Sequence, residues 1–341
     1  MAKVSIIIPI FKAEKWIERC ARSLFNQTLD EIEYIFVDDC SPDNSIAIAQ
    51  RMIDTYKGII DFKIIKNESN CGLSVARNNG LNQSTGKYIF FLDSDDYLRE
   101  DCLQVLLGAL KELPDAEVIL GNFYDNRVNA PYISFHNNKQ IVFDNPQLLK
   151  ACYKGKIPLI AWNSLVVRNL ITDYNLSFVP GLVHEDNLWI LKLYSHVNKF
   201  VFVPQITMVY ENNPISIMNT VGKDATQELP HLMIIFAELL DSFDEKHTLD
   251  YTFFLASFLY RMLDLANSCT TDQLMEVRTF RNKLFARSLR HGRFVLVLYE
   301  LWMFNPLCKL FRYKFVRHNL YRIKRVTYAF ASFFDHFHMC R

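Results

Sequence analysis

The sequence lacks an uncharged apolar run of the ~20 residues that a membrane-spanning helix needs. The nearest approach, FVLVLYELWMF at residues 294–304, is too short and contains Glu300. A signal peptide is not expected either, because the apolar start of the chain, VSIIIPIF, contains Pro9 and leads into Lys12 instead of a small-residue cleavage site. We therefore expect neither a membrane-spanning helix nor a secretory leader.

The eight cysteines include no CxxC pair, which argues against a zinc site. A chain of 341 residues that is 50% hydrophobic can also build a core without disulfide bonds. Reduced thiols in a cytoplasm are the simplest expectation. Internal repeats and low-complexity segments are absent as well, and the apolar content excludes a disordered chain.

Two kinds of segment alternate over the first 125 residues. Short β-branched and aromatic runs, typical of strands buried on both faces, occur at residues 3–11, 33–37, 62–66, 87–92 and 117–123. Patterns with the apolar spacing of helices lie between them, the clearest at residues 14–28 and 44–57. This alternation predicts an α/β fold with a doubly wound, mostly parallel sheet flanked by helices, which binds its ligands beyond the carboxyl ends of the strands.

The pattern of the chain changes near residue 220. Residues 126–220 mix strand-like and helical patterns, and from about residue 224 the pattern becomes mainly helical. We therefore expect a first domain over residues 1–220 and a helical, basic and aromatic region over residues 221–341.

Two acidic clusters each follow a predicted strand directly. VDD ends at Asp39, and FFLDSDDYL brings Asp93, Asp95 and Asp96 behind an apolar run. Ionised carboxylates repel one another, so such a cluster requires a partner, which could be water, an arginine or a divalent cation. Asp-x-Asp at a strand end suits Mg²⁺ or Mn²⁺, although the same pattern on its own is more often a solvated turn.

Two further motifs carry side chains with useful chemistry. Arg77 lies on a predicted short helix, LSVARNNGL, and could either clamp a bound phosphate or form an ion pair with an aspartate and no ligand. In VHEDNLW, Glu185 and Asp186 begin a predicted helix, where they could serve the helix dipole or supply a general base. His184 is a second candidate for a base or a metal ligand.

The ordered set of these pieces resembles the inverting glycosyltransferases of family 2, which have the GT-A fold. The resemblance covers residues 1 to about 220 through the pieces VSIIIPIFKAEKWIERCARSLFNQT, EYIFVDDCSPDNS, NCGLSVARNNGL, GKYIFFLDSDDYL, AWNSLVVR and HEDNLW. It implies a GT-A domain in which residues 1–125 bind a nucleotide sugar and residues 126–220 hold the acceptor and the catalytic base.

The resemblance also implies roles for single residues. Asp39 matches the position that contacts the nucleotide base, and Asp93 and Asp95 match the metal-binding pair, with Asp95 favoured for direct contact. Asp186 matches the catalytic base, and Glu185 is its neighbour. The other donor-side positions are Pro9, Phe11, Arg77, Asn78 and Ser94, and the acceptor-side positions are Trp162 and Asn163.

The activity implied is transfer of a sugar from a nucleotide-sugar donor, most simply a UDP-sugar, to a hydroxyl of a saccharide or lipid-linked acceptor in surface-polysaccharide or glycolipid assembly. Mg²⁺ or Mn²⁺ would be the cofactor, and a single displacement would invert the sugar. The alternative enzyme is a sugar-1-phosphate nucleotidyltransferase, although PIFKAEKW is not its glycine-rich signature. The alternative non-enzyme is an inactive nucleotide-sugar-binding protein.

The sequence departs from such relatives at three places. They often carry glycine in place of Cys40 and lysine in place of Ser164. Many also carry an arginine near YENNPISIM, where this chain has Glu211, Asn212 and Asn213. Because such an arginine can help to hold a diphosphate, the contribution of this segment stays open at this point.

Basic residues are concentrated at the C-terminal end. Residues 278–341 contain 14 Lys or Arg against two acids, in a chain whose net charge is +1. The segment 306–334 interleaves bases with Phe, Tyr, Leu and Ile, which suits either a membrane interface or a basic helix packed on the first domain. Nucleic-acid binding is not expected, because no recognised module is present. We expect a cytoplasmic protein bound peripherally to the inner face of the cell membrane.

Overall fold

The computed structural model describes residues 3–29, 31–58, 61–133, 139–217, 224–242, 249–266 and 269–290. Contacts divide the chain into two compact units, and the second unit begins at Asp224. The sequence prediction puts this boundary at residue 220. The segment 306–334, and with it the predicted membrane contact, lies outside the described residues.

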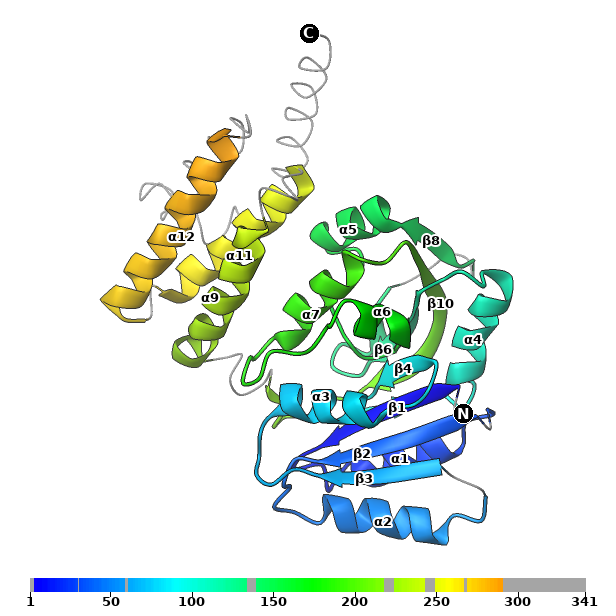
Figure 1. The fold of residues 1–341 in the computed structure, drawn as a ribbon. Coiled ribbons are helices and arrows are strands. Elements are labelled where there is room, and N and C mark those ends of the chain that lie inside the picture. The colour runs from blue at the N-terminus through cyan, green and yellow to red at the C-terminus, as the bar shows by residue number, and fades with distance from the viewer. Residues whose placement is uncertain are drawn as a thin grey trace. The chain divides into compact units, whose positions relative to one another are not determined.

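The first unit contains one sheet with helices on both of its faces (Figure 1). Its strands follow the order β3-β2-β1-β4-β9-β6-β10-β5, with β7 beside β6 and β8 beside β10. The strands are β1 (Val4–Ile10), β2 (Ile32–Asp38), β3 (Asp61–Lys66), β4 (Tyr88–Phe91), β5 (Tyr97–Leu98), β6 (Val118–Asp125), β7 (Ala130–Pro131), β8 (Ile141–Asp144), β9 (Ser164–Val167) and β10 (Lys199–Tyr210). The helices are α1 (Ile17–Phe25), α2 (Ser45–Thr55), α3 (Leu73–Gln83), α4 (Cys102–Glu112), α5 (Asn145–Tyr153), α6 (Arg168–Asp173) and α7 (Glu185–Tyr194).

One half of the sheet is parallel and the other half is mixed. β3, β2, β1 and β4 pair in parallel, as the alternation of strands and helices predicts. β9 runs antiparallel to β4 and β6, and β5 and β8 run antiparallel to β10, so this half departs from the mostly parallel expectation. The predicted α/β class, with a central sheet between helices, is confirmed.

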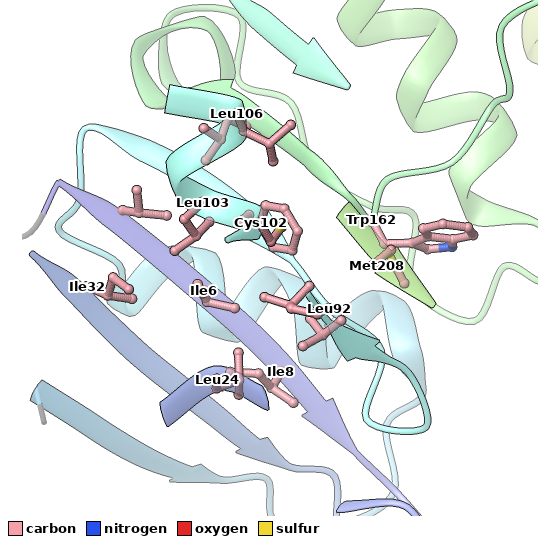
Figure 2. Close-up of a cluster of buried hydrophobic side chains, with 14 of the residues drawn as sticks. Ile6, Ile8, Leu24, Ile32, Leu92, Cys102, Leu103, Leu106, Trp162 and Met208 are labelled. Carbon is pink, nitrogen blue, oxygen red and sulfur yellow. The ribbon is translucent and has the colours of Figure 1, made fainter. Parts of the chain in front are cut away.

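β1 contributes side chains to both faces of the sheet, and all seven of its residues are buried. Ile6 and Ile8 point into the apolar cluster shared with α1, α2 and α4, where Leu24 and Leu103 meet them (Figure 2). Ile7 points into the opposite cluster, which is shared with α3, α5, α6 and α7. Two apolar layers therefore enclose the strands and fix the positions of their carboxyl ends.

α3 packs unusually close to β1. A Cβ at Gly80 would lie 2.3 Å from Cγ2 of Ile7, so this approach requires glycine. The helix begins after Gly72, whose φ of +85° turns the chain out of the preceding loop. This close packing brings Arg77, in the middle of α3, to the residues that follow β4.

Glu33, near the amino end of β2, is a buried acid with several hydrogen-bond donors. Its Oε1 accepts from Oγ of Ser5 at 2.5 Å and from the N–H of Gly86 at 3.0 Å, and its Oε2 accepts from Nζ of Lys63 at 3.1 Å. Burial alone would raise the pKa of Glu33, but these bonds and those from Thr85 lower it to about 2. The ionised carboxylate therefore joins β1, β2 and the turn before β4.

We expect Glu33→Gln to lower the free energy of unfolding at pH 7 by about 3 kcal/mol. The folded pKa lies below the unfolded value of 4.5, so the stabilisation is present above about pH 4.5 and is lost as the pH falls towards 2. Urea unfolding of both chains at pH 7 and pH 3 measures the difference, which should shrink at pH 3. A difference that does not depend on pH contradicts the role of the charge. Glu18→Gln, in an exposed pair with Arg22, is the control and should change stability by less than about 1 kcal/mol.

The described part of the second unit consists of α9 (Ala225–Asp241), α11 (Leu249–Ala266) and α12 (Thr271–Arg290). Phe236 of α9 packs against Phe258 of α11 and Phe280 of α12, with ring centroids 6.2 and 5.5 Å apart. The predicted helical character of this region is confirmed for these residues. Within the described ranges of the whole chain, no helix has both the length and the apolar character needed to cross a membrane.

Candidate active site

One buried arginine gathers three carboxylates from two parts of the chain. Arg77 is 1% exposed, and Phe178 covers its guanidinium at 5.2 Å. Nη2 donates to Oδ1 of Asp93 at 2.9 Å. Nη1 donates to Oε1 of Glu185 at 2.7 Å and to Oδ1 of Asp186 at 2.6 Å. The acids that follow β4 and those that begin α7 thus form one group with Arg77. We call these four residues the Arg77 cluster.

Strained backbone gathers at the same edge of the sheet. His184, directly before α7, has a φ of +62°, which is uncommon for a residue with a side chain. Lys12, Cys40 and Asn163 have φ values between +52° and +59° in the loops after β1, after β2 and before β9. Such conformations cost free energy and persist where the surrounding structure holds them, often at functional sites.

Asp186 is held in one orientation and retains access to solvent. Its Oδ2 accepts from the backbone N–H of Ala161 at 3.1 Å, opposite the bond to Arg77, and its side chain is 17% exposed. Burial raises the pKa of Asp186, although Arg77 opposes the rise. Burial, together with the charge of Asp186, raises the pKa of Glu185 to about 7. A carboxylate with a raised pKa is a stronger proton acceptor, so this pair suits general base chemistry.

The three aspartates after β4 have different environments. Asp93 is 24% exposed where it contacts Arg77, and Oδ2 of Asp95 accepts from Nδ2 of Asn213 at 2.8 Å. Asp96 is 1% exposed, and its Oδ1 accepts from the N–H of Glu211 at 2.8 Å. Burial and the neighbouring carboxylates raise the pKa of Asp95, and they raise that of Asp96 well above its usual range. Asp96 is therefore structural, and Asp93 and Asp95 are the two acids suited to a ligand.

Asp93 and Asp95 fit a magnesium or manganese ion. The described residues contain no group of three or more His, Cys, Asp and Glu side chains arranged as a metal site. These ions need only one or two carboxylates, however, because water and phosphate oxygens complete their coordination. The charge of Asp93 contributes to the raised pKa of Asp95, and a divalent cation would relieve that repulsion.

Asp39 follows β2 and anchors the loop that leads into α3. It is 3% exposed. Its Oδ1 accepts from Nδ2 of Asn67 at 2.7 Å and from the N–H of Cys71 at 2.9 Å, and its Oδ2 accepts from the N–H of Gly72 at 2.8 Å. Asp39 thus lies at the predicted edge of the sheet, where it fixes the entry into the helix that carries Arg77.

The predicted contact of Arg77 with the diphosphate stays a prediction, and the observed contacts of its Nη atoms are with carboxylates. Carboxylates occupy both of its Nη atoms, and the side chain is buried. Within the described residues, Nε of Arg77 has no hydrogen-bond partner, so the guanidinium keeps a donor that the carboxylates do not use. Of the two readings of the sequence, the ion pair without a phosphate describes the observed contacts.

Of the other predicted donor-side residues, one is exposed, two are buried and one is hydrogen-bonded to the backbone of a neighbouring loop. Phe11 is 38% exposed after β1, whereas Pro9 and Ser94 are buried. The amide of Asn78 donates from Nδ2 to the carbonyl of Phe178 at 2.8 Å and accepts at Oδ1 from the N–H of Phe178 at 2.9 Å. Asn78 therefore holds the loop before α7, and its predicted contact with the nucleotide stays a prediction.

The acceptor-side pair is corrected in part. Asn163 is fully buried, donates from Nδ2 to the carbonyl of Gly121 at 2.8 Å and accepts at Oδ1 from Oγ1 of Thr207 at 2.7 Å. It joins β6 to β10 and cannot contact an acceptor. Trp162 is 7% exposed and stacks on Tyr210 with the ring centroids 5.3 Å apart.

Sequence reasoning missed the groups that hold the aspartates. The backbone N–H of Ala161 carries no residue signature, so no motif could have identified it. Asn213 and Glu211 lie in the segment YENNPISIM. The absence of the arginine that many relatives carry there was the one signal in the sequence that this segment differs. Glu211 also pairs with Arg19 of α1 at 2.6 Å. Arg19 thus brings a cation to this segment, and Arg127, whose guanidinium lies 4.3 Å from the ring centroid of Tyr210, brings another.

Comparison with known proteins supports the prediction from the motifs. Residues 5–171 match the model of the family described as glycosyl transferase family 2. Glycosyltransferase GlyA of Streptococcus pneumoniae serotype 4 is 29% identical over 218 residues, which are 61% of this chain and 30% of GlyA. The uncharacterized glycosyltransferase YibD of Escherichia coli K12 is 25% identical over 321 residues, 89% of this chain and 92% of YibD. The chain thus spans less than a third of GlyA and most of YibD.

Solved structures share the fold. Staphylococcus aureus TarS 1–349 in complex with UDP-GlcNAc aligns with a TM-score of 0.65 and 20% identity, over 87% of this chain and 89% of that chain. The family match ends before Glu185 and Asp186, so the roles of these two acids depend on the geometry of the Arg77 cluster. Residues 5–171 thus match glycosyl transferase family 2, the family that the motifs resemble.

Proposed function

We propose that this chain transfers a sugar from a nucleotide-sugar donor, most simply a UDP-sugar, to a hydroxyl group of a saccharide or lipid-linked acceptor. The observation that carries the proposal is the Arg77 cluster, in which one guanidinium contacts both Asp93 of the Asp-x-Asp turn and Asp186 of the HED motif. A candidate metal ligand, Asp93, and a candidate general base, Asp186, thus contact the same arginine. The shared fold with TarS, solved with UDP-GlcNAc, supports a UDP-sugar.

Asp186 is the proposed general base. Its carboxylate would take the proton of the acceptor hydroxyl while the hydroxyl oxygen attacks the sugar carbon on the face opposite the leaving diphosphate, which inverts that carbon. Arg77 and the N–H of Ala161 hold the carboxylate in place for this transfer. A Mg²⁺ or Mn²⁺ held by Asp93 and Asp95 would neutralise charge on the nucleoside diphosphate.

The two parts of the first unit would serve different substrates. Residues 1–125 contribute Asp39 and the Asp-x-Asp turn to the donor side, and residues 126–220 contribute Asp186 to the acceptor side. An acceptor from surface-polysaccharide or glycolipid assembly follows the resemblance of the motifs. If that acceptor is anchored in lipid, the protein works peripherally at the inner face of the membrane.

Thermal unfolding with a panel of nucleotides and nucleotide sugars tests donor and metal together. We expect UDP to raise Tm in the presence of Mn²⁺ and to have little effect in EDTA, because the diphosphate and the ion bind as one unit. In Asp95→Asn, the UDP concentration that gives half of the maximal Tm shift should rise at least about tenfold. Asp61→Asn, an exposed aspartate at the start of β3, is the matched control. Equal UDP shifts with and without Mn²⁺, unchanged in Asp95→Asn, contradict the metal assignment.

The reaction products separate the proposed activity from its alternatives. Sugar transfer releases UDP, a sugar-1-phosphate nucleotidyltransferase releases pyrophosphate, and an inactive binding protein releases neither. The anomeric configuration of the product, determined by NMR, tests inversion.

A further inference from the structure

The second unit carries a one-sided distribution of charge on α12. The last 13 residues of this helix contain five bases and no acid, whereas its two acids, Asp272 and Glu276, lie in the first two turns. The five bases are Arg278, Arg281, Lys283, Arg287 and Arg290. Nothing in the proposed chemistry of the first unit uses this helix.

α12 buries one side and leaves the other exposed. It packs inward through Val277, Leu284 and Ser288, which are fully buried. At 3.6 residues per turn, the opposite side is an exposed stripe of Met275, Thr279, Asn282, Ala286 and Leu289. Its two large apolar side chains, Met275 and Leu289, are 59% and 37% exposed.

Exposed bases border this stripe. By the same helical spacing, Arg278 lies along one side of the stripe, and Lys283 and Arg290 lie towards the other. We call Met275, Arg278, Lys283, Leu289 and Arg290 the outer face of α12.

The bases of the outer face keep their charge available. Arg287 turns inward and pairs with Asp241 of α9 at 3.6 Å. Among the ion pairs formed within the described ranges, none involves Arg278, Lys283 or Arg290. The outer face therefore presents three positive charges around two exposed apolar side chains.

We propose that the outer face of α12 docks on a membrane surface that contains anionic phospholipid. The three bases would attract the headgroups, and Met275 and Leu289 would enter the boundary between headgroups and acyl chains. The proposal rests on the proposed function in one respect, since docking would bring the enzyme to a lipid-linked acceptor. A nucleic acid would attract the bases as well but would leave the two apolar side chains without a partner.

Co-sedimentation of the full chain with vesicles tests this surface. Vesicles of phosphatidylglycerol and phosphatidylcholine should bind the protein at 0.1 M salt, and vesicles of phosphatidylcholine alone should bind it weakly. In the variant Arg278→Gln/Lys283→Gln/Arg290→Gln the partition coefficient should fall about 100-fold, because each base near an anionic surface contributes about a factor of five. The control Lys15→Gln/Arg51→Gln/Lys111→Gln removes three exposed bases from the first unit and should change binding less than about threefold.

Three results would overturn the proposal. The first is a native chain that does not bind the anionic vesicles. The second is equal binding by the native chain and the α12 variant. The third is an α12 variant that loses binding to an oligonucleotide but keeps binding to vesicles, which would assign the face to nucleic acid. The UDP and Mn²⁺ shift in Tm is measured on the same samples, so a fault in the donor site is seen separately from a fault in docking.

Discussion

Asp186→Asn is expected to lower the rate of sugar transfer about 10²–10⁴-fold. The amide has nearly the same shape as the carboxylate but cannot accept the proton of the acceptor hydroxyl. UDP binding with Mn²⁺ should be retained and weakened only modestly, because Asp186 lies outside the Asp-x-Asp turn and its charge acts on the cation only from a distance. Initial rates at saturating donor give the loss of turnover, and the Tm shift with UDP reports donor binding.

Glu185→Gln is the informative companion of this variant. Glu185 is 8% exposed and shares Nη1 of Arg77 with Asp186, so its replacement should reduce the rate less than Asp186→Asn does. Asp115→Asn, at a side chain that is 67% exposed, controls for removal of an acid and should leave the rate unchanged. A near-native rate in Asp186→Asn would remove Asp186 as the base. A greater loss in Glu185→Gln would transfer that role to its neighbour.

Arg77→Met should lower the free energy of unfolding at pH 7 by about 3–5 kcal/mol. The change leaves Asp93, Glu185 and Asp186 close together without their shared cation, and their mutual repulsion then has no compensation inside the protein. The loss should be smaller at pH 5, because burial already raises the pKa values of Glu185 and Asp186 and protonation removes their charge. Urea unfolding at the two pH values measures both effects.

Arg127→Met is the matched control for Arg77→Met. Arg127 also holds a carboxylate through its guanidinium, that of Asp125, but it is 45% exposed and should cost less than about 1 kcal/mol. Adding Glu185→Gln to Arg77→Met should restore part of the lost stability, since one of the uncompensated charges is removed. Equal losses in the free energy of unfolding for the two arginine variants would contradict a larger contribution from the buried Arg77 cluster.

The parallel half of the fold could be predicted because each strand there has its own local signal. VSIIIPI is apolar apart from Ser5 and becomes β1, and FFLDSDD marks both the end of β4 and its acids. The antiparallel half could not be predicted in the same way. β9 pairs with β6 across 44 to 48 residues of chain and with β4 across 77 to 79, and those pairings depend on contacts that no local window contains.

Sequence motifs likewise identified some features of the candidate site and not others. The acids Asp93, Asp95 and Asp186 could be named from motifs, because each follows a strand or begins a helix. The partner of Arg77 could not be read from sequence, since phosphate and carboxylate present the same oxygen geometry to a guanidinium. The structure places Glu185 and Asp186 beside Arg77, more than 100 residues away in the chain.

The shared guanidinium of Arg77 makes two equilibria dependent on each other. The negative charge of Asp93 is one of the causes that raise the pKa of Asp186, so a cation that neutralises Asp93 lowers the proton affinity of Asp186. By thermodynamic reciprocity, deprotonation of Asp186 strengthens cation binding by the same factor. A cation bound on the proposed donor side would therefore lower the pKa of the carboxylate on the proposed acceptor side. The two halves of the site act as one proton-linked unit even though different parts of the sequence supply them.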